Sequence, residues 1–287
     1  MASDAYAALQ ATLGELGSAR RRYAAAMTLY NAGQISAEVL EVYRSCASLD
    51  GQDPLVLIAD YGLQSPVAAF AISSLLAEID KYLATLNGPG IADVRQGIAA
   101  ALDTKISPQT PVSNPVISGH LDAALDATAN QISELVASIR AASLHLRWVT
   151  YDGYDPQDIG TDFAQGHAFT LLLGQDAPIA AKDFDLGLFL IAPNVLYRDH
   201  KHAAPELYAP LTGPHGWRFS PGTPLVVKAA HQPIWNAPYA SHLTEVGAVP
   251  FLCIFAWTRD VDALAQVIPA RDWTVLEALR LGGMDAA

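Results

Sequence analysis

Cysteine is almost absent from this sequence, which has only Cys46 and Cys253 in 287 residues. Two thiols cannot form the disulfide framework of a small secreted domain, and we expect both to be buried in a reducing compartment. The first residues also lack the basic start and apolar stretch of a secretory signal, and no run of about 18 apolar residues indicates a membrane span. These absences predict a soluble, cytoplasmic protein.

Positive charge is also scarce, because 17 Lys and Arg residues stand against 29 Asp and Glu, a formal net charge of -12. A surface this acidic repels phosphate backbones and anionic lipids, so we expect neither nucleic acid nor a membrane as partner. Hydrophobic residues make up 51% of the chain and charged residues only 16%. That composition supplies a large core and excludes wholesale disorder.

Residues 1–147 have the apolar spacing that is typical of helices, and we predict a helical packing or oligomerisation domain there. Ser36 is a good N-cap, and Ser65 before Pro66 is a preferred helix start. The proline-rich stretch 107–115 predicts an extended connection. Apolar faces of these helices are compatible with a homodimer. The predicted helices span about residues 4–32, 36–48, 65–86, 91–104 and 120–146.

Residues 148–287 contain short apolar runs, separated by glycine, proline, aspartate and asparagine, and several of them alternate as half-buried strands do. Strands of this length with turns between them predict an antiparallel sandwich or barrel, followed by a helical tail over about 260–281. The expected fold class is therefore α+β, with an N-terminal helical domain and a C-terminal antiparallel β-barrel. The five runs are residues 168–173, 184–191, 206–211, 225–229 and 249–257.

Histidines gather in the second half, where five of the eight lie between residues 200 and 242. Residues two apart on an extended strand point to the same face, so His200 and His202 are expected to share one. Glu206 and Tyr208 continue that parity if the residues between form only a bend. A third imidazole can come from His231, which follows another strand-like run. This set predicts a site for a divalent first-row metal inside the barrel.

A structural role is the alternative for each histidine, because a single histidine in a barrel is more often hydrogen-bonded in the core or rim. That alternative is weaker for the segment from His200 to Tyr208, since burying four polar side chains there without a ligand is costly. His215 and His242 can line the pocket mouth, or they can lie on the surface. Ligands of this type accept zinc, iron, manganese, nickel or cobalt, so the metal's identity stays open.

These motifs resemble those of a known family. The pattern His200-X-His202-X3-Glu206-X6-Gly213 is similar to the first metal motif of the cupins. His231, with Asn236 a few residues later, is similar to a loose form of the second metal motif. Within the cupins, the dimethylsulfoniopropionate (DMSP) lyases also carry a helical region ahead of the barrel. Further features that resemble them are Tyr197, Tyr208, Trp217 and the strand 250–257. The resemblance covers about residues 165–260 and implies a cupin domain, a double-stranded β-helix.

The resemblance implies a metal-dependent carbon–sulfur lyase. Tyr208 would remove a proton from the carbon beside the substrate carboxylate, with Tyr197 as its neighbour, and dimethyl sulfide and acrylate would be the products. Tyrosine has an ordinary pKa near 10, so it is a poor base at neutral pH unless a nearby cation lowers that pKa. The implied metal ligands are His200, His202, Glu206 and His231.

Aromatic side chains are expected to form the substrate pocket, because a sulfonium can bind over the face of an aromatic ring. Trp257 lies inside an apolar run and is expected in the core instead. The residues expected to line the pocket are Trp217, Trp235 and Tyr239.

Other activities stay open, because the residues after His231 depart from the lyase pattern. One alternative is a related β-elimination on a small carboxylate. Another is a different cupin enzyme, such as an Fe(II) dioxygenase or an isomerase, and oxygen consumption separates a dioxygenase from a lyase. A third is a non-catalytic, ligand-sensing cupin, which the presence of both Tyr197 and Tyr208 disfavours.

Overall fold

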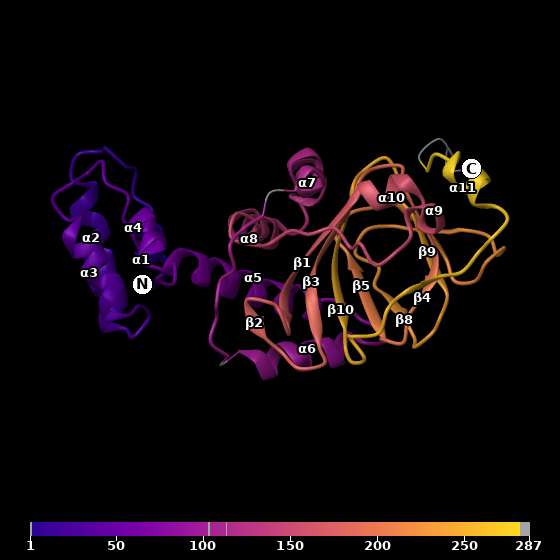
Figure 1. Cartoon of the computed structure of the whole chain (residues 1–287), viewed down its shortest axis with the longest axis horizontal. Coiled ribbons are helices and arrows are strands. Elements are labelled where there is room, and N and C mark those ends of the chain that lie inside the picture. The colour runs from indigo at the N-terminus through magenta and orange to yellow at the C-terminus, as the bar shows by residue number, and fades with distance from the viewer. Residues whose placement is uncertain (1, 103, 113, 282–287) are drawn as a thin grey trace. The chain divides into compact units, whose positions relative to one another are not determined.

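The computed structural model describes residues 2–102, 104–112 and 114–281 (Figure 1). The chain divides into two compact units, one up to Ser73 and one from Ser74 onward. The division falls inside a helix, well before residue 147, where the sequence changes from helix-like spacing to short strand-like runs. Among the described residues, no helix combines the length and the apolar character needed to cross a bilayer.

The first unit is a small set of helices whose starts are visible in the sequence. The Ser36 and Asp53 side chains accept hydrogen bonds from Val39 and Leu55 backbone N–H groups and cap the third and fourth helices. A single helix over residues 4–32 was expected, but Gly14 and Gly17 take positive φ values and interrupt it. The helices wholly in this unit are α1 (Ala2–Leu9), α2 (Ser18–Asn31), α3 (Ala37–Ser45) and α4 (Pro54–Asp60).

The following helices agree with the expected ones except around residue 130. The predicted helix over 120–146 is two helices, and the first begins earlier, at Pro115, where the Asn114 side chain caps it. That helix, α7, packs against strands β1, β3 and β10 of the second unit. The helices are α5 (Pro66–Ala84), α6 (Ile91–Ala101), α7 (Pro115–Thr128) and α8 (Ser133–Ser143).

After two short helices, α9 (Pro156–Ile159) and α10 (Thr161–Gln165), the chain forms strands. All five predicted apolar runs are strands. The strands are β1 (His167–Gly174), β2 (Ile179–Ala180), β3 (Asp185–Ile191), β4 (Leu196–Lys201), β5 (Glu206–Pro210), β6 (His215–Arg218), β7 (Val226–Lys228), β8 (Ile234–Asn236), β9 (His242–Glu245), β10 (Phe251–Trp257) and β11 (Gln266–Val267).

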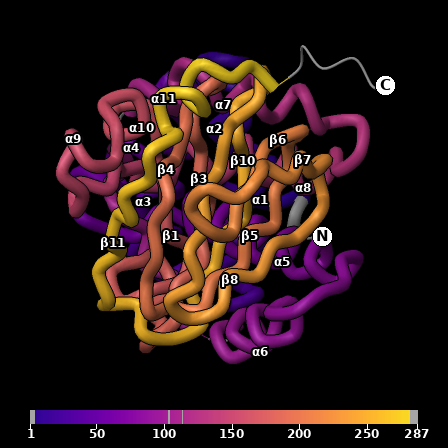
Figure 2. Tube along the Cα trace, turned by 90° about the vertical axis from the view of Figure 1, so that its right-hand side faces the viewer, coloured from indigo at the N-terminus to yellow at the C-terminus, as the bar shows by residue number. Residues whose placement is uncertain are grey.

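The strands form two sheets, in the orders β2-β1-β3-β10-β5-β8 and β11-β4-β9-β6-β7. Figure 2 shows β3, β10 and β5 side by side. All pairs are antiparallel except β1 with β2. Aromatic side chains of both sheets meet in one buried cluster, which includes Phe189, Tyr208 and Phe251 of the first sheet and Tyr197 and Trp217 of the second. This arrangement confirms the expected α+β class with a double-stranded β-helix.

The C-terminal segment is not the helix that was expected over 260–281. It adds β11 to the edge of the second sheet and forms only the short helix α11 (Trp273–Glu277). Ion pairs hold it in place, because the buried Arg218 guanidinium bonds both Asp199 of β4 and Asp272 just before α11. Tertiary pairing has overridden a weak helical pattern here.

Candidate metal centre and its pocket

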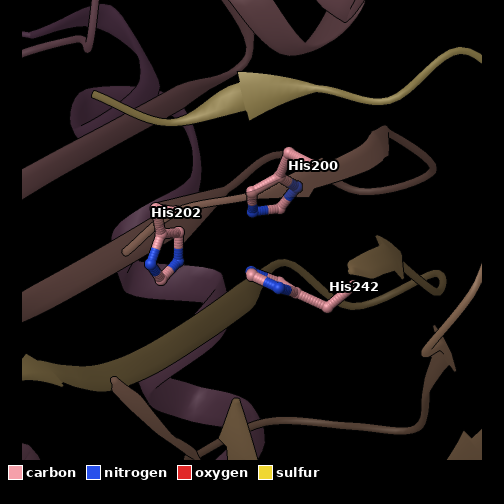
Figure 3. Close-up of side chains that lie close together, drawn as sticks. All are labelled: His200, His202 and His242. Carbon is pink, nitrogen blue, oxygen red and sulfur yellow. The ribbon is translucent and has the colours of Figure 1, made fainter. Parts of the chain in front are cut away.

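Three buried histidines come together between the sheets: His200 of β4, His202 just after it and His242 of β9. One ring nitrogen of each lies within 4.8 Å of those of the other two. Figure 3 shows the three rings turned toward a common point. The pairing of β4 with β9 sets His200 directly opposite His242, with ring centroids 4.0 Å apart.

Backbone hydrogen bonds decide which nitrogen of each ring is available. The Nδ1 atoms of His200, His202 and His242 lie 2.8, 2.8 and 3.0 Å from backbone carbonyl oxygens two residues away along the chain. Because a carbonyl oxygen only accepts, each Nδ1 carries the proton and each neutral ring presents an unprotonated Nε2. Within the described residues, the buried Nε2 atoms of His200 and His242 have no hydrogen-bond partner.

Glu206 adds a carboxylate to the three imidazoles. Its Oε2 atom lies 3.3 Å from Nε2 of His202 and 3.3 Å from Nε2 of His242. Asn236 donates to the same oxygen at 3.1 Å, and the Trp257 indole N–H donates to Oε1 at 2.8 Å. Burial works to raise the pKa of Glu206, but His202 and His242 outweigh it and hold that pKa well below its usual range.

These residues fit a divalent metal ion. Burial works to lower the pKa of His202, but the Glu206 charge outweighs it, and the net pKa of His202 is raised. The cluster therefore stabilises a positive charge beside Glu206, which a metal can supply in place of a proton. Burial and the neighbouring histidines push the pKa of His200 well below its ordinary value, which keeps its Nε2 lone pair available. Three imidazoles and a carboxylate are a common donor set for first-row metals.

His231, expected as the third imidazole, lies elsewhere, and His242 takes that place. The His231 Nδ1 atom is 3.0 Å from the Tyr82 hydroxyl of α5, and its Nε2 atom is 2.5 Å from Oε1 of Gln131. Both ring nitrogens are thus occupied by protein groups. The correction has a topological cause, because β9 pairs with β4, whereas the residues after His231 form β8, which pairs with β5.

A β-bulge in β4 brings Tyr197 to the same interior. The register with β9 shifts between Tyr197 and His200, which are three residues apart and would otherwise face opposite sides. Instead their rings stack, with centroids 3.8 Å apart. The Tyr197 hydroxyl is 2.9 Å from that of Tyr154. Burial, followed by the neighbouring tyrosines, raises the pKa of Tyr197 well above its ordinary value.

Tyr208 of β5 lies in the same space, as the strand parity predicts. Its ring centroid is 6.2 Å from that of His242 and 5.8 Å from that of Trp217. Burial, followed by the charge of Glu206, raises the pKa of Tyr208 well above its ordinary value. The tyrosine is therefore protonated in the protein unless a cation offsets the carboxylate.

A cavity of about 260 Å³ opens beside these residues. Glu206, Tyr197 and Tyr208 form part of its wall, and most of the remainder is aromatic. The other aromatic side chains that line it are Tyr151, Tyr154, Phe163, Phe169, Phe189, Phe255 and Trp257.

The three side chains expected to line this pocket do not do so. Trp217 is in the core with 1% of its surface exposed, packed on Tyr208. Trp235 lies against Gly90 at the start of α6, where a Cβ atom would collide with the indole. Tyr239 is 65% exposed in the turn before β9. The tryptophan of the pocket is Trp257, expected in the core, whose ring stacks on His202 with centroids 4.5 Å apart.

Two tyrosines of the pocket, Tyr151 and Tyr154, were missed in the sequence. They lie in the irregular segment between α8 and α9. Tyr154 packs edge-on against His200, with centroids 6.3 Å apart, and Tyr151 packs against Tyr154. Two tyrosines three residues apart in a polar loop are a signal that can be noticed, although nothing local shows where they point.

Two solved structures share the fold of this chain. A solved structure described as "DMSP lyases RdDddP and RnDddQII" shares 19% identity over 70% of this chain and 100% of that chain, with a TM-score of 0.57. The DMSP lyase DddQ from Ruegeria pomeroyi DSS-3 shares 24% identity over 69% of this chain and 95% of that chain, with a TM-score of 0.54.

Identities this low show a common fold. No curated protein sequence matches the chain. The profile of the dimethylsulfoniopropionate lyase family, however, matches residues 92–253, which is more than half of the chain. The protein therefore belongs to the dimethylsulfoniopropionate lyase family.

Proposed function

We propose that this protein is a metal-dependent lyase that cleaves DMSP, a small zwitterionic carboxylate, into dimethyl sulfide and acrylate. The observation that carries the proposal is the convergence of three imidazoles, each with Nδ1 committed to the backbone, beside a tyrosine-lined cavity. Membership of the DMSP lyase family supports the choice of substrate and reaction.

The residues that would hold the metal are His200, His202 and His242, with Glu206 as the carboxylate ligand. A bound divalent cation offsets negative charge on the substrate carboxylate and lowers the pKa of a nearby tyrosine. Asn236 and Trp257 orient Glu206 through their hydrogen bonds. Supporting bonds of this kind fix the positions of metal ligands.

Tyr208, as tyrosinate, accepts a proton from the carbon next to the carboxylate. The electron pair of that C–H bond forms the C=C bond of acrylate, and the C–S bond breaks with its pair on sulfur. Dimethyl sulfide leaves, and the proton passes from Tyr208 to solvent, so the reaction needs no oxidant. Tyr197 is tied to Tyr154 and serves as a wall of the pocket, which favours Tyr208 as the base.

A headspace assay for dimethyl sulfide tests the proposal. Purified protein is stripped of metal, reloaded with Mn²⁺, Fe²⁺ or Zn²⁺ and given DMSP, while an oxygen electrode follows the same mixture. We expect metal-dependent release of dimethyl sulfide and acrylate in equal amounts without oxygen uptake. A metal-loaded protein that releases neither product from DMSP contradicts the proposed reaction, and oxygen uptake indicates a dioxygenase.

A further inference from the structure

Two carboxylates lie at opposite ends of one row of side chains in the cavity. Glu206 of β5 pairs with Trp257 of β10, and Trp257 pairs with Asp185 of β3. Residues in register on adjacent strands point to the same face, and all three line the cavity. Strands are about 4.8 Å apart, so the Glu206 and Asp185 backbones are separated by roughly 10 Å. The Trp257 backbone lies between them, and the Trp257 indole N–H donates to Glu206.

Among the residues that the structure describes, Asp185 has no countercharge. It is partly buried, and no ion pair joins it to a described residue. The charged groups that act on it are the acidic residues Asp262, Asp183 and Asp176. Burial, followed by these three neighbours, raises the pKa of Asp185 to about 6, so it is mostly ionised at neutral pH.

The Asp185 carboxylate lies close to the backbone of β1. Its Oδ1 atom packs so close to Gly174 of β1 that a Cβ atom there would come within 2.6 Å of it. Gly174 has a φ of +157°, in the range that favours glycine, and this permits the close approach. A partly buried carboxylate close to the backbone, with no cation of the described residues beside it, is unfavourable until a positive ligand occupies the cavity.

The cavity around this carboxylate suits a cation. Trp257, Phe169 and Phe255 line it, and the faces of aromatic rings attract positive charge. The opposite end, at Glu206 and the histidines, is where a metal and an anionic group are placed under the proposed function. The cavity is therefore polarised along its length, with anion recognition at one end and cation recognition at the other.

We propose that Asp185 is a specificity-determining residue that recognises the cationic end of a zwitterionic carboxylate. The orientation of the bound ligand in the cavity rests on the proposed function, which places the ligand carboxylate at the metal end. Asp185 selects a sulfonium or quaternary ammonium head over a neutral head of the same size. It also repels a second anionic group, which excludes dicarboxylates.

The test compares ligands of similar size that differ chiefly in the charge of the head. The probes are 3-(trimethylammonio)propanoate, which has a fixed cation, and 4-methylpentanoate, which has nearly the shape of DMSP and a neutral head. Binding to the metal-loaded protein is measured by calorimetry for the wild type, Asp185→Asn and Asp185→Glu. Asp185→Asn keeps the shape of the side chain and removes its charge, and Asp185→Glu restores the charge.

We expect Asp185→Asn to weaken binding of the trimethylammonio ligand about tenfold or more, as loss of a partly desolvated charge pair does. Binding of 4-methylpentanoate should change less than about twofold, and Asp185→Glu should recover part of the cation affinity. The KM for DMSP should rise by a similar factor with little change in kcat. Equal losses for both probes would indicate a structural role and overturn the proposal, as would unchanged binding of both.

The two proposals fail differently. Cation binding that depends on Asp185, in a protein that does not cleave DMSP, refutes the reaction and supports the role of Asp185. DMSP cleavage with the same KM in the wild type and Asp185→Asn supports the reaction and overturns the role of Asp185. A wild type that binds neither probe also overturns it.

Discussion

Two regions of the second unit hold histidines that the sequence makes look alike, and the structure gives them different hydrogen-bond partners. In the interior between β4 and β9, His200, His202 and His242 each bind the backbone through one nitrogen and present the other to a shared space. At the turn before β8, His231 uses both nitrogens on Tyr82 and Gln131. Occupancy of the second nitrogen separates a histidine that is available to a metal from one that is committed to protein groups.

Two further buried histidines resemble His231, because both of their ring nitrogens contact protein groups. His167 lies 2.6 Å from the Phe163 carbonyl oxygen through Nδ1 and accepts from the Tyr151 backbone N–H through Nε2. His215 accepts from Gly247 through Nδ1 and contacts the Thr212 hydroxyl through Nε2. Burial lowers the pKa of both His167 and His215 to about 4, and both are neutral, structural side chains.

The largest effect expected from this comparison follows His242→Ala. Loss of one of three imidazoles should lower metal affinity by at least about a hundredfold and abolish DMSP cleavage, because even supporting groups of a metal site cost 10–100-fold. Metal content after dialysis, measured by mass spectrometry, checks this. His231→Ala is the matched control and should keep the wild-type metal content. The reverse result would restore His231 as the ligand.

Within the metal region, Tyr208→Phe should separate chemistry from metal binding. We expect kcat to fall by about 10²–10⁴-fold, the usual range for loss of a general base, with metal content unchanged. Tyr197→Phe keeps the stack on His200 and should cost much less. Steady-state kinetics of both variants, at equal metal loading, check the assignment. A larger loss of kcat in Tyr197→Phe would transfer the base role to that residue.

At the other end of the cavity, the ionisation of Asp185 should make both stability and cation affinity depend on pH. Its pKa of about 6 in the folded protein lies above the value near 3.9 of an unfolded chain. The folded state therefore binds more protons between those values, and this group's contribution to the free energy of unfolding falls as pH rises from about 4 to about 6. Over the same range, affinity for a trimethylammonio ligand should rise as Asp185 ionises.

Asp185→Asn should remove both the fall in this group's contribution to stability and the rise in cation affinity as pH increases. Thermal melts and binding measured at pH 5, 6 and 7 check them, and the variant should melt slightly higher than the wild type at pH 7. A wild type whose cation affinity does not change between pH 5 and pH 7 would argue against a titrating carboxylate at this end.

The smallest expected effect is the loss of stability in His231→Ala. Removing two hydrogen bonds at a half-exposed position should lower the free energy of unfolding by about 1–2 kcal/mol, since each is worth about 1 kcal/mol. Denaturant unfolding of the metal-free protein measures it. His242→Ala in the same metal-free state serves as the comparison. No loss in His231→Ala would mean that the contacts to Tyr82 and Gln131 contribute nothing measurable.

Local sequence was enough for most elements of the fold. Ser36 and Ser65 begin helices because their side chains accept from free backbone N–H groups of the first turn, and short apolar runs, several of them alternating, indicated the five strands. Long-range effects account for the errors. The helix expected over 4–32 is interrupted where Asp50 accepts from the Gly17 and Ala19 backbone N–H groups, a contact that no local pattern shows.

Because β4 and β5 lie in different sheets, only tertiary packing joins their inward faces. The sequence by itself determined that His200 shares a face with His202, and Glu206 with Tyr208, since strand parity is a local property of the backbone. It could not determine that His242 joins them, since that depends on β9 pairing with β4 across 42 residues. Nor could it show that a bulge turns Tyr197 inward, or that Trp257 and Asp185 stand in register with Glu206. Those are consequences of strand register, and only the tertiary structure decides which strands meet.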